Sequence, residues 1–163
     1  ADLDDPVALE LPGSGPLLPG EWDLVKENVL GELQIEILLR EKLGSRASEA
    51  AAAGWDGDIY RVYRRKDHPE KTCLVWVSEW DTKDDAREFA EAFEKHIGKL
   101  RGEKDGSFVL TKGKGVTAIV GAGGADAAEG LAEWACRFTS APKRLDFRAY
   151  KPEVPFPEGS REF

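Results

Sequence analysis

Several residue types that often carry chemistry are scarce in this chain. Its 163 residues include two cysteines, two histidines and no methionine. Two cysteines cannot build a disulfide framework, and Cys73 and Cys136 form no CxxC motif. We expect both to be small buried residues, and a bridge between them stays open. His68 falls in a polar hairpin loop and His96 at the edge of a helical stripe, with no HExxH or HxH spacing. The sequence therefore predicts no metal site and no cofactor.

Basic charge and long apolar runs are also lacking. The formal net charge is −8, which argues against nucleic acid as a partner, since phosphates require a basic face. No apolar run reaches the roughly 18 residues of a transmembrane helix, so no membrane span is predicted. No basic stretch followed by an apolar one opens the chain, so no signal peptide is predicted. A chain without methionine that begins at Ala1 is expected to be a processed or trimmed form.

Proline and glycine divide the chain into three parts. Residues 1–21 are rich in both and predict an extended arm, with residues 7–11 as a short edge strand. Residues 22–138 have the length and periodicity of a single domain. Residues 139–163 contain four of the nine prolines and predict a tail that either wraps around the domain or is partly disordered.

Hydrophobic periodicity predicts the helices of this domain. Apolar residues recur every four positions over 23–43 and predict a long helix with Asp23 as its N-cap: Val25, Val29, Leu33 and Ile37. A short Ala-rich helix is expected at 48–53. An amphipathic helix opened by Asp81-Thr82 is expected to reach Leu100, and a last helix runs from about residue 126 to residue 138.

Two hairpins complete the pattern. Residues 59–65 pair with 72–80, and 107–111 pair with 116–120. The segment 55–58, Trp-Asp-Gly-Asp, has the composition of a turn. Both faces of 72–80 are apolar, which is typical of a central strand. These elements predict an α+β fold with an antiparallel sheet of about four strands. Their order along the chain is α(α)–ββ–α–ββ–α, so that two ββα units pack with helices.

Candidate chemistry is sparse. Glu32, which lies beside Gly31 in an apolar stretch, is the carboxylate that we single out: either a buried, hydrogen-bonded group or a weak candidate for a general base. Asp56 and Asp58 are too few for a calcium site and are expected to form the turn. Five aromatic residues at strand spacing are expected to lie in the core or to line a cleft: Trp55, Tyr60, Tyr63, Trp76 and Trp80.

Four segments together resemble a known group of proteins. They are Val29-Leu-Gly-Glu-Leu-Gln-Ile35, Ala51-Ala-Ala-Gly-Trp-Asp-Gly-Asp-Ile-Tyr60, Leu74-Val-Trp-Val-Ser-Glu-Trp-Asp-Thr82 and Asp84-Asp-Ala-Arg-Glu-Phe89. This order is similar to the C-terminal half of secreted or lipid-anchored prokaryotic zincin-like proteins, whose HExxH helix lies in the N-terminal half. The resemblance covers roughly residues 5–100, and HExxH is absent here. It implies a secreted or periplasmic location, an accessory domain, and a structural role for residues 54–58.

Three functions follow as hypotheses. The first is a non-catalytic extracytoplasmic domain for binding or assembly, with another protein or an upstream domain of the same precursor as partner. Its candidate ligand or partner surface is Trp55, Asp56, Asp58 and Trp80. The second is a portion of a zinc-dependent hydrolase whose HExxH segment lies outside this chain and to which Glu32 contributes. The third is a small-ligand carrier with an aromatic pocket, which predicts a sizeable apolar cavity between the helix at 23–43 and the sheet.

Overall fold

The computed structural model describes residues 6–12, 21–100 and 106–142 and shows an α+β fold with antiparallel sheets, as predicted. In chain order the elements are β1 (Val7–Glu10), β2 (Trp22–Asn28), α1 (Glu32–Leu43), α2 (Ser45–Ala52), β3 (Trp55–Arg65), β4 (Thr72–Trp80), α3 (Lys83–Leu100), β5 (Phe108–Lys112), β6 (Gly115–Val120), α4 (Ala125–Ala135) and β7 (Thr139–Pro142).

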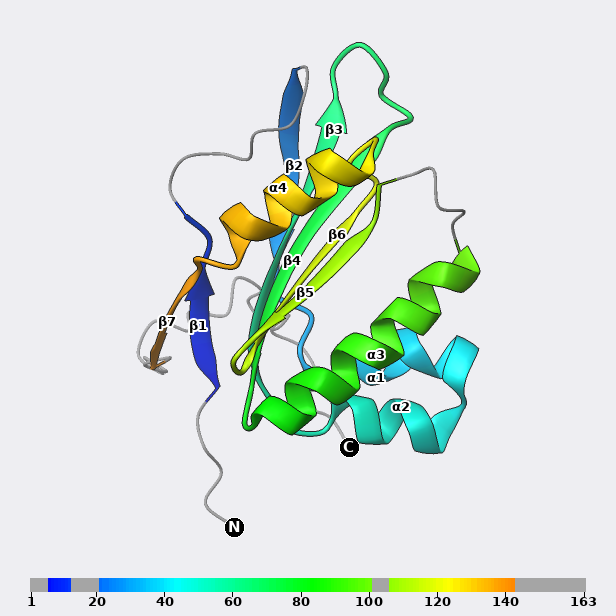
Figure 1. Ribbon diagram of the computed structural model, residues 1–163, viewed down its shortest axis with the longest axis vertical. Coiled ribbons are helices and arrows are strands. Elements are labelled where there is room, and N and C mark those ends of the chain that lie inside the picture. Colours follow the sequence, from blue (N-terminus) through cyan, green and yellow to red (C-terminus); the bar gives the residue numbers. More distant parts are fainter. Residues whose placement is uncertain (1–5, 13–20, 101–105, 143–163) are drawn as a thin grey trace, which may run out of the picture.

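Five strands form the main sheet, in the order β2-β3-β4-β6-β5, and each neighbouring pair is antiparallel. β1 and β7 form a separate antiparallel pair. The helices α1, α2 and α3 pack against one face of the main sheet, whereas α4 and β1 pack against the other (Figure 1). The sheet therefore separates two hydrophobic cores.

The central position predicted for residues 72–80 is confirmed, because β4 lies between β3 and β6. Its side chains alternate between the two cores. Trp76 and Trp80 lie in the core beneath α3 and are 2% and 0% exposed. Cys73, Val75 and Val77 lie in the core beneath α4. The unbroken apolar run of β4 from Cys73 to Val77 is thus explained by burial on both sides.

The helix predicted over 23–43 is wrong in its first part. Trp22–Asn28 is strand β2, which pairs with β3 along its length. α1 begins only at Glu32. The preceding residue, Gly31, has a φ of 83°, which lies outside the range of a right-handed α-helix. Val25 and Val29 continue the four-residue apolar spacing of α1 toward the N-terminus. Hydrogen bonding to β3 nevertheless makes this segment a strand, because it outweighs the local helical periodicity.

The turn predicted at 55–58 is also wrong, because these residues begin β3. The chain turns one residue earlier, at Gly54, with φ of 79°. A register shift between Trp55 and Gly57 leaves Asp56 as a bulge, which explains why a turn-like composition occurs inside a strand. With β1, β2 and β7, the described residues contain seven strands rather than about four.

Both hairpins and the remaining helices are confirmed. In α3 the Thr82 hydroxyl accepts a hydrogen bond from the Asp85 backbone N–H at 3.2 Å, an N-terminal cap. The predicted apolar stripe of this helix is buried, with Phe89, Phe93 and Ile97 between 1% and 7% exposed. Capping and periodicity therefore agree for α3, as the sequence indicated.

The segments outside the predicted domain contribute to the fold. β1, in the arm, pairs with β7, which falls in the predicted tail, and residues 143–163 of that tail lie outside the described residues. Cys73 and Cys136 are not joined in a disulfide. Cys73 is buried as predicted, whereas Cys136 is half-buried and its thiol donates to the Glu133 carbonyl oxygen at 3.2 Å.

Candidate functional site

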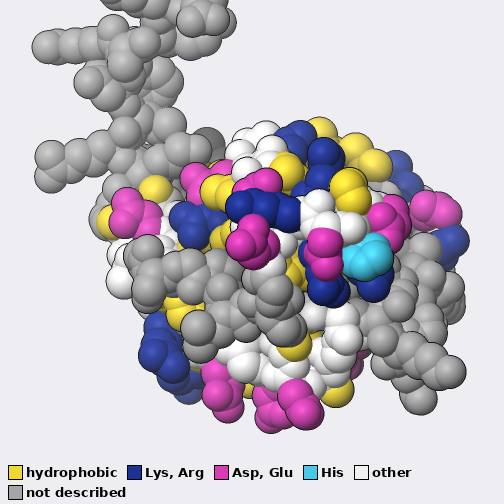
Figure 2. Space-filling view, turned by 90° about the horizontal axis from the view of Figure 1, so that it is seen from above, with side chains coloured by type: hydrophobic (Ala, Val, Ile, Leu, Met, Phe, Trp, Pro, Cys, Tyr) yellow, Lys and Arg dark blue, Asp and Glu magenta, His cyan; other side chains and the backbone are white. Residues whose placement is uncertain are grey.

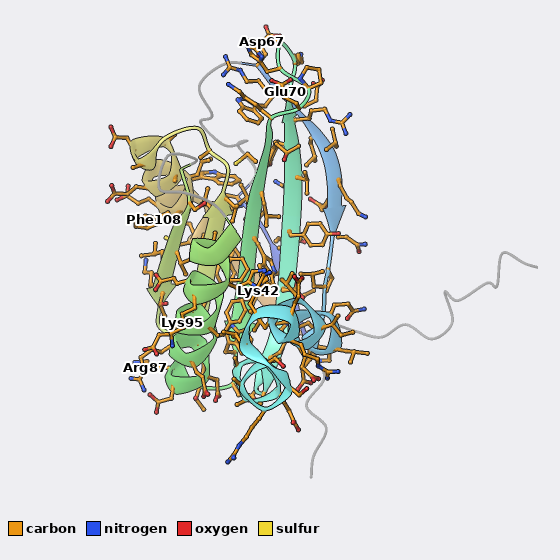
Figure 3. The ribbon with its side chains drawn as sticks, turned by 90° about the vertical axis from the view of Figure 1, so that its right-hand side faces the viewer. Lys42, Asp67, Glu70, Arg87, Lys95 and Phe108 are labelled. Atoms are coloured by element: carbon orange, nitrogen blue, oxygen red, sulfur yellow. The ribbon has the colours of Figure 1, made fainter. Side chains whose placement is uncertain are left out.

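An apolar cavity of about 590 Å³ opens between α1, α3 and the main sheet. Figure 3 views this side of the molecule, where α1 and α2 lie in front of the sheet beside α3; Lys42 marks the end of α1 and Lys95 lies on α3. Within the described ranges, no Asp, Glu, Lys or Arg lines the cavity. The lining residues are Leu30, Gln34, Ile37, Leu38, Tyr60, Leu74, Trp76, Phe93, His96, Ile97 and Val120.

The floor of the cavity is one face of the sheet. Tyr60 on β3 lies opposite Trp76 on β4, and Leu74 on β4 lies opposite Val120 on β6. Alternate residues of a strand share a face, so Leu74 and Trp76 point to the same side. Pairing across three strands therefore assembles a contiguous apolar floor.

Aromatic contacts fix the wall that α3 provides. Phe93 meets the Trp76 ring edge to face, with centroids 5.2 Å apart, and Phe89 meets it in the same manner at 5.3 Å. Phe89 also stacks on Trp80 at 4.6 Å. Such pairs contribute about 0.5–1.5 kcal/mol each beyond their buried area. The position of the Trp76 indole is thus set by packing as well as by the sheet.

The carboxylate of Asp58 binds the start of α1 to the sheet. Asp58 is 2% exposed, and its two oxygens accept four hydrogen bonds. Two come from the backbone N–H groups of Leu30 and Gly31, both at 2.9 Å. Two come from the indole N–H groups of Trp55 at 3.1 Å and Trp76 at 3.0 Å. Because Leu30 and Trp76 line the cavity, Asp58 positions two of its walls without touching its interior.

His96 is the most enclosed polar residue of the cavity wall. It is 4% exposed, rather than at the boundary as the sequence suggested, and its ring stacks on Phe93 with centroids 6.1 Å apart. Its Nδ1 has no hydrogen-bond partner among the residues described. Burial lowers the pKa of His96 below 6.5, with Glu41 opposing the shift and Lys42 adding to it. The imidazole is therefore neutral at neutral pH.

The surface predicted at Trp55, Asp56, Asp58 and Trp80 does not fit the structure. Trp80 and Asp58 lie in the interior, while Trp55 and Asp56 are half-buried. None of the four lines the large cavity, although Trp55 and Asp58 border a small pocket of about 90 Å³ beneath β1. Three of these residues instead stabilise the fold: Trp55 pairs with Trp80 across β3 and β4, and its indole N–H donates a hydrogen bond to Asp58.

Burial and neighbours raise the pKa of Asp56 above 3.8. Partial burial contributes most, the carboxylates of Asp81 and Glu79 add to it, and a hydrogen bond with the backbone of Val7 acts in the opposite direction. The ionised form of Asp56 is therefore disfavoured at this position.

Glu32 is exposed in the first turn of α1, which contradicts the prediction of a buried carboxylate. Its negative charge there complements the positive end of the helix dipole. In the described ranges no three His, Cys, Asp or Glu side chains are grouped to hold a metal ion. The same ranges contain no helix long and apolar enough to cross a membrane.

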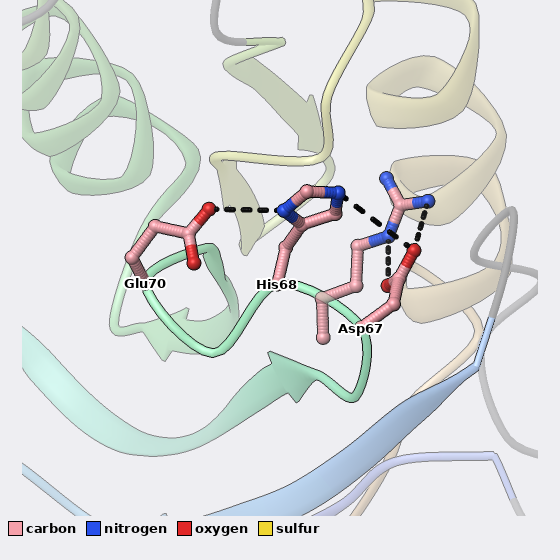
Figure 4. A network of polar contacts seen from close by, with 4 residues as sticks. Asp67, His68 and Glu70 are labelled. Carbon is pink, nitrogen blue, oxygen red and sulfur yellow. Dashed lines mark hydrogen bonds and ion pairs between the residues drawn. The ribbon is translucent and has the colours of Figure 1, made fainter.

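The β3–β4 loop carries an exposed polar network (Figure 4). Arg65 donates to both carboxylate oxygens of Asp67 at 2.7 and 3.0 Å, and this contact lowers the pKa of Asp67. His68 Nδ1 lies 3.2 Å from Glu70 Oε1. Seen from above, acidic and basic side chains are interspersed on this end of the molecule (Figure 2). Exposed ion pairs contribute little stability, so this loop is a solvated turn, as the sequence indicated for His68.

The sequence identified only part of the cavity. Tyr60 and Trp76 were among the aromatic residues expected in a core or a cleft, and both line it. Leu30, Leu74 and His96 were not recognised. The sequence signal that points to the cavity is the apolar character of residues 33–39 on all sides of the helix. Such a helix cannot bury every apolar side chain, and Leu33 and Ile37 are 61% and 56% exposed.

Comparison with known proteins identifies a family for this chain. Residues 21–130 match the family model described as "Domain of unknown function (DUF8575)", and the chain belongs to this family. No curated protein and no solved structure matches the chain. Every residue that lines the cavity, from Leu30 to Val120, falls within the matched range.

Proposed function

We propose that this member of the family binds a small apolar ligand in the cavity between α1, α3 and the main sheet. The observation that carries the proposal is the cavity itself. Its volume of about 590 Å³ falls within the range of roughly 300–1,000 Å³ that ligand pockets occupy. Close-packed protein cores leave few voids larger than a water molecule. Of the three hypotheses drawn from the sequence, this geometry supports the small-ligand carrier best.

The cost of leaving the cavity empty also supports a bound apolar ligand. Ile37 and Leu38 of α1 line it and are 56% and 36% exposed, although both are large apolar side chains. A ligand that covers apolar surface contributes about 25 cal/mol per Å² removed from water. The walls are held in place by Asp58 and the aromatic contacts, so little ordering energy is lost on binding.

The experiment is a fluorescence titration with N-phenyl-1-naphthylamine, an uncharged apolar dye that brightens in apolar surroundings. We expect saturable binding at one site. The dye should be displaced by uncharged apolar molecules. Absence of saturable binding to the folded chain would refute the proposal.

A second candidate is the binding or assembly role predicted from the sequence. Leu24, Val25 and Val29, on β2 and just after it, are 43–50% exposed, and β2 is an edge strand of the main sheet. Exposed edge strands pair readily with another strand. For this role we propose a second copy of the chain as partner. Sedimentation velocity over a range of concentrations tests it: a dimer that Val25→Lys dissociates supports it, and a monomer at all concentrations refutes it.

From the resemblance to zincin-like proteins we also propose an extracytoplasmic location and a peptidase-like neighbour. Glu32, the residue proposed to serve a hydrolase, is exposed at the start of α1. Nothing about its surroundings favours acid–base chemistry over its role at the helix terminus.

A further inference from the structure

The polar groups of the cavity wall indicate what kind of ligand it takes. Three of the lining residues have polar side chains: Gln34, Tyr60 and His96. Gln34 is exposed and Tyr60 is half-buried, so water reaches both in the free protein. His96 is 4% exposed. It is therefore the polar group that an enclosed ligand meets away from water.

The imidazole of His96 lacks a partner that buried polar groups normally have. Its Nδ1 is buried without a hydrogen bond to any described residue, and its stacking neighbour Phe93 cannot provide one. A buried polar atom left unpaired costs about 1–3 kcal/mol, and such atoms are rare in native structures. Because Nδ1 is closed off from the cavity as well as from water, a ligand group pairs with it only when the ring turns toward the cavity, and such pairing would remove part of that cost.

The charges around the cavity argue against a charged ligand. Among the side chains that the structure describes, none that is acidic or basic lines it other than His96. Beyond the wall, Glu41 and Lys42 of α1 act on His96 with opposite signs. An ionised ligand head would lose its hydration without gaining an opposite charge, which is strongly unfavourable. A hydroxyl both donates and accepts, so it matches a neutral imidazole whichever nitrogen bears the proton.

We propose that the cavity takes an uncharged amphiphile, with an apolar body against Leu74, Trp76 and Ile97 and one hydroxyl group that hydrogen-bonds to His96. This inference rests on the proposed function and adds the chemical class of the ligand. In this arrangement the body supplies affinity through burial, and the hydroxyl fixes the orientation of the ligand.

The test displaces N-phenyl-1-naphthylamine from the full chain with three ligands of equal chain length: decanol, chlorodecane and decanoate. Decanol should displace the dye at about 3–10-fold lower concentration than chlorodecane, the value of one hydrogen bond, and decanoate should be weakest. In His96→Phe, which keeps a ring for stacking on Phe93, the advantage of decanol should disappear. The affinity for chlorodecane should stay within about twofold, since only a hydrogen bond is removed.

A spectroscopic measurement on the unaltered protein removes any dependence on how the variant folds. The chain has two histidines, so ¹⁵N NMR of the imidazole nitrogens gives two sets of signals. Decanol should shift those of His96 and leave those of His68, in the exposed β3–β4 loop, unchanged. Chlorodecane should shift the His96 nitrogens less, because it neither donates nor accepts a strong hydrogen bond.

The outcomes separate the two proposals. If neither the dye nor chlorodecane binds, the proposed function and this inference both fail. If both bind but decanol has no advantage, or keeps it in His96→Phe, only the inference fails. Preference for decanoate would refute the proposal that the ligand is uncharged. His96 nitrogen signals that ignore bound decanol would overturn the role of His96 whether or not the variant folds.

Discussion

Oδ2 of Asp58 accepts a hydrogen bond from the indole N–H of Trp76 at 3.0 Å in the interior of the protein. The same oxygen accepts from the backbone N–H of Leu30 at 2.9 Å. Trp76 lies on the sheet and Leu30 precedes α1, and both line the cavity. One carboxylate oxygen thus joins the floor of the cavity to its helical wall, so fold stability and ligand binding depend on the same side chain.

Asp58→Asn is expected to destabilise the protein by about 2–6 kcal/mol. Each oxygen of Asp58 accepts two hydrogen bonds, so an amide in either orientation leaves two buried donors facing an NH₂ group, at about 1–3 kcal/mol each. Urea denaturation measures the change. Dye binding should also weaken, because Leu30 and Trp76 lose a common anchor. An unchanged free energy of unfolding would show that the four contacts do not act together.

Asp56→Asn, the same chemical change two residues earlier, is expected to raise the melting temperature at neutral pH. Burial, Asp81 and Glu79 raise the pKa of Asp56 in the folded state above 3.8, so its ionised form is disfavoured there relative to the unfolded chain. As pH falls through the folded-state pKa, the wild-type carboxyl becomes neutral and the penalty disappears. The advantage of the variant should therefore be largest near neutral pH and shrink in acid. Melting curves across this range check it, and an advantage that grows in acid would contradict it.

Leu74→Phe should weaken dye binding at least about tenfold, because the larger ring occupies the cavity floor and competes with the ligand for apolar surface. Leu110→Phe on β5 is the matched control: Leu110 is half-buried against the other core and does not line the cavity. Titration of both variants should find normal affinity in the control. Equal losses in the two would place the dye elsewhere.

Gly57→Ala should destabilise the protein by about 1–3 kcal/mol, the usual cost of overpacking. A Cβ at Gly57 would overlap the carbonyl oxygen of Val7, where β1 crosses β3. Gly98→Ala in α3 is the control, since a Cβ there meets no atom of the other described elements within 4 Å, and alanine should stabilise the helix by about 0.5–1 kcal/mol. Thermal melts compare the two, and similar shifts would mean that β1 does not press on Gly57.

Local pattern was sufficient for several elements. α3 was predicted because its cap at Thr82 and its apolar stripe agree over many turns, and both report interactions within one helix. The two hairpins were predicted from strands that are close in sequence and joined by short loops. β4 is predicted to be central because both of its faces carry apolar residues, with an unbroken apolar run from Cys73 to Val77.

What the sequence by itself determined is therefore the α+β class, the hairpins and the amphipathic helices, since periodicity and capping act over a few residues. Only the tertiary structure decided that Trp22–Asn28 is a strand, because its hydrogen bonds come from β3. It also decided the role of Asp58, whose donors Leu30 and Trp76 are 28 and 18 positions away. The cavity, too, is a feature that only the tertiary structure decided. It lies between α1, α3 and the sheet, and no local pattern reports how closely distant elements pack.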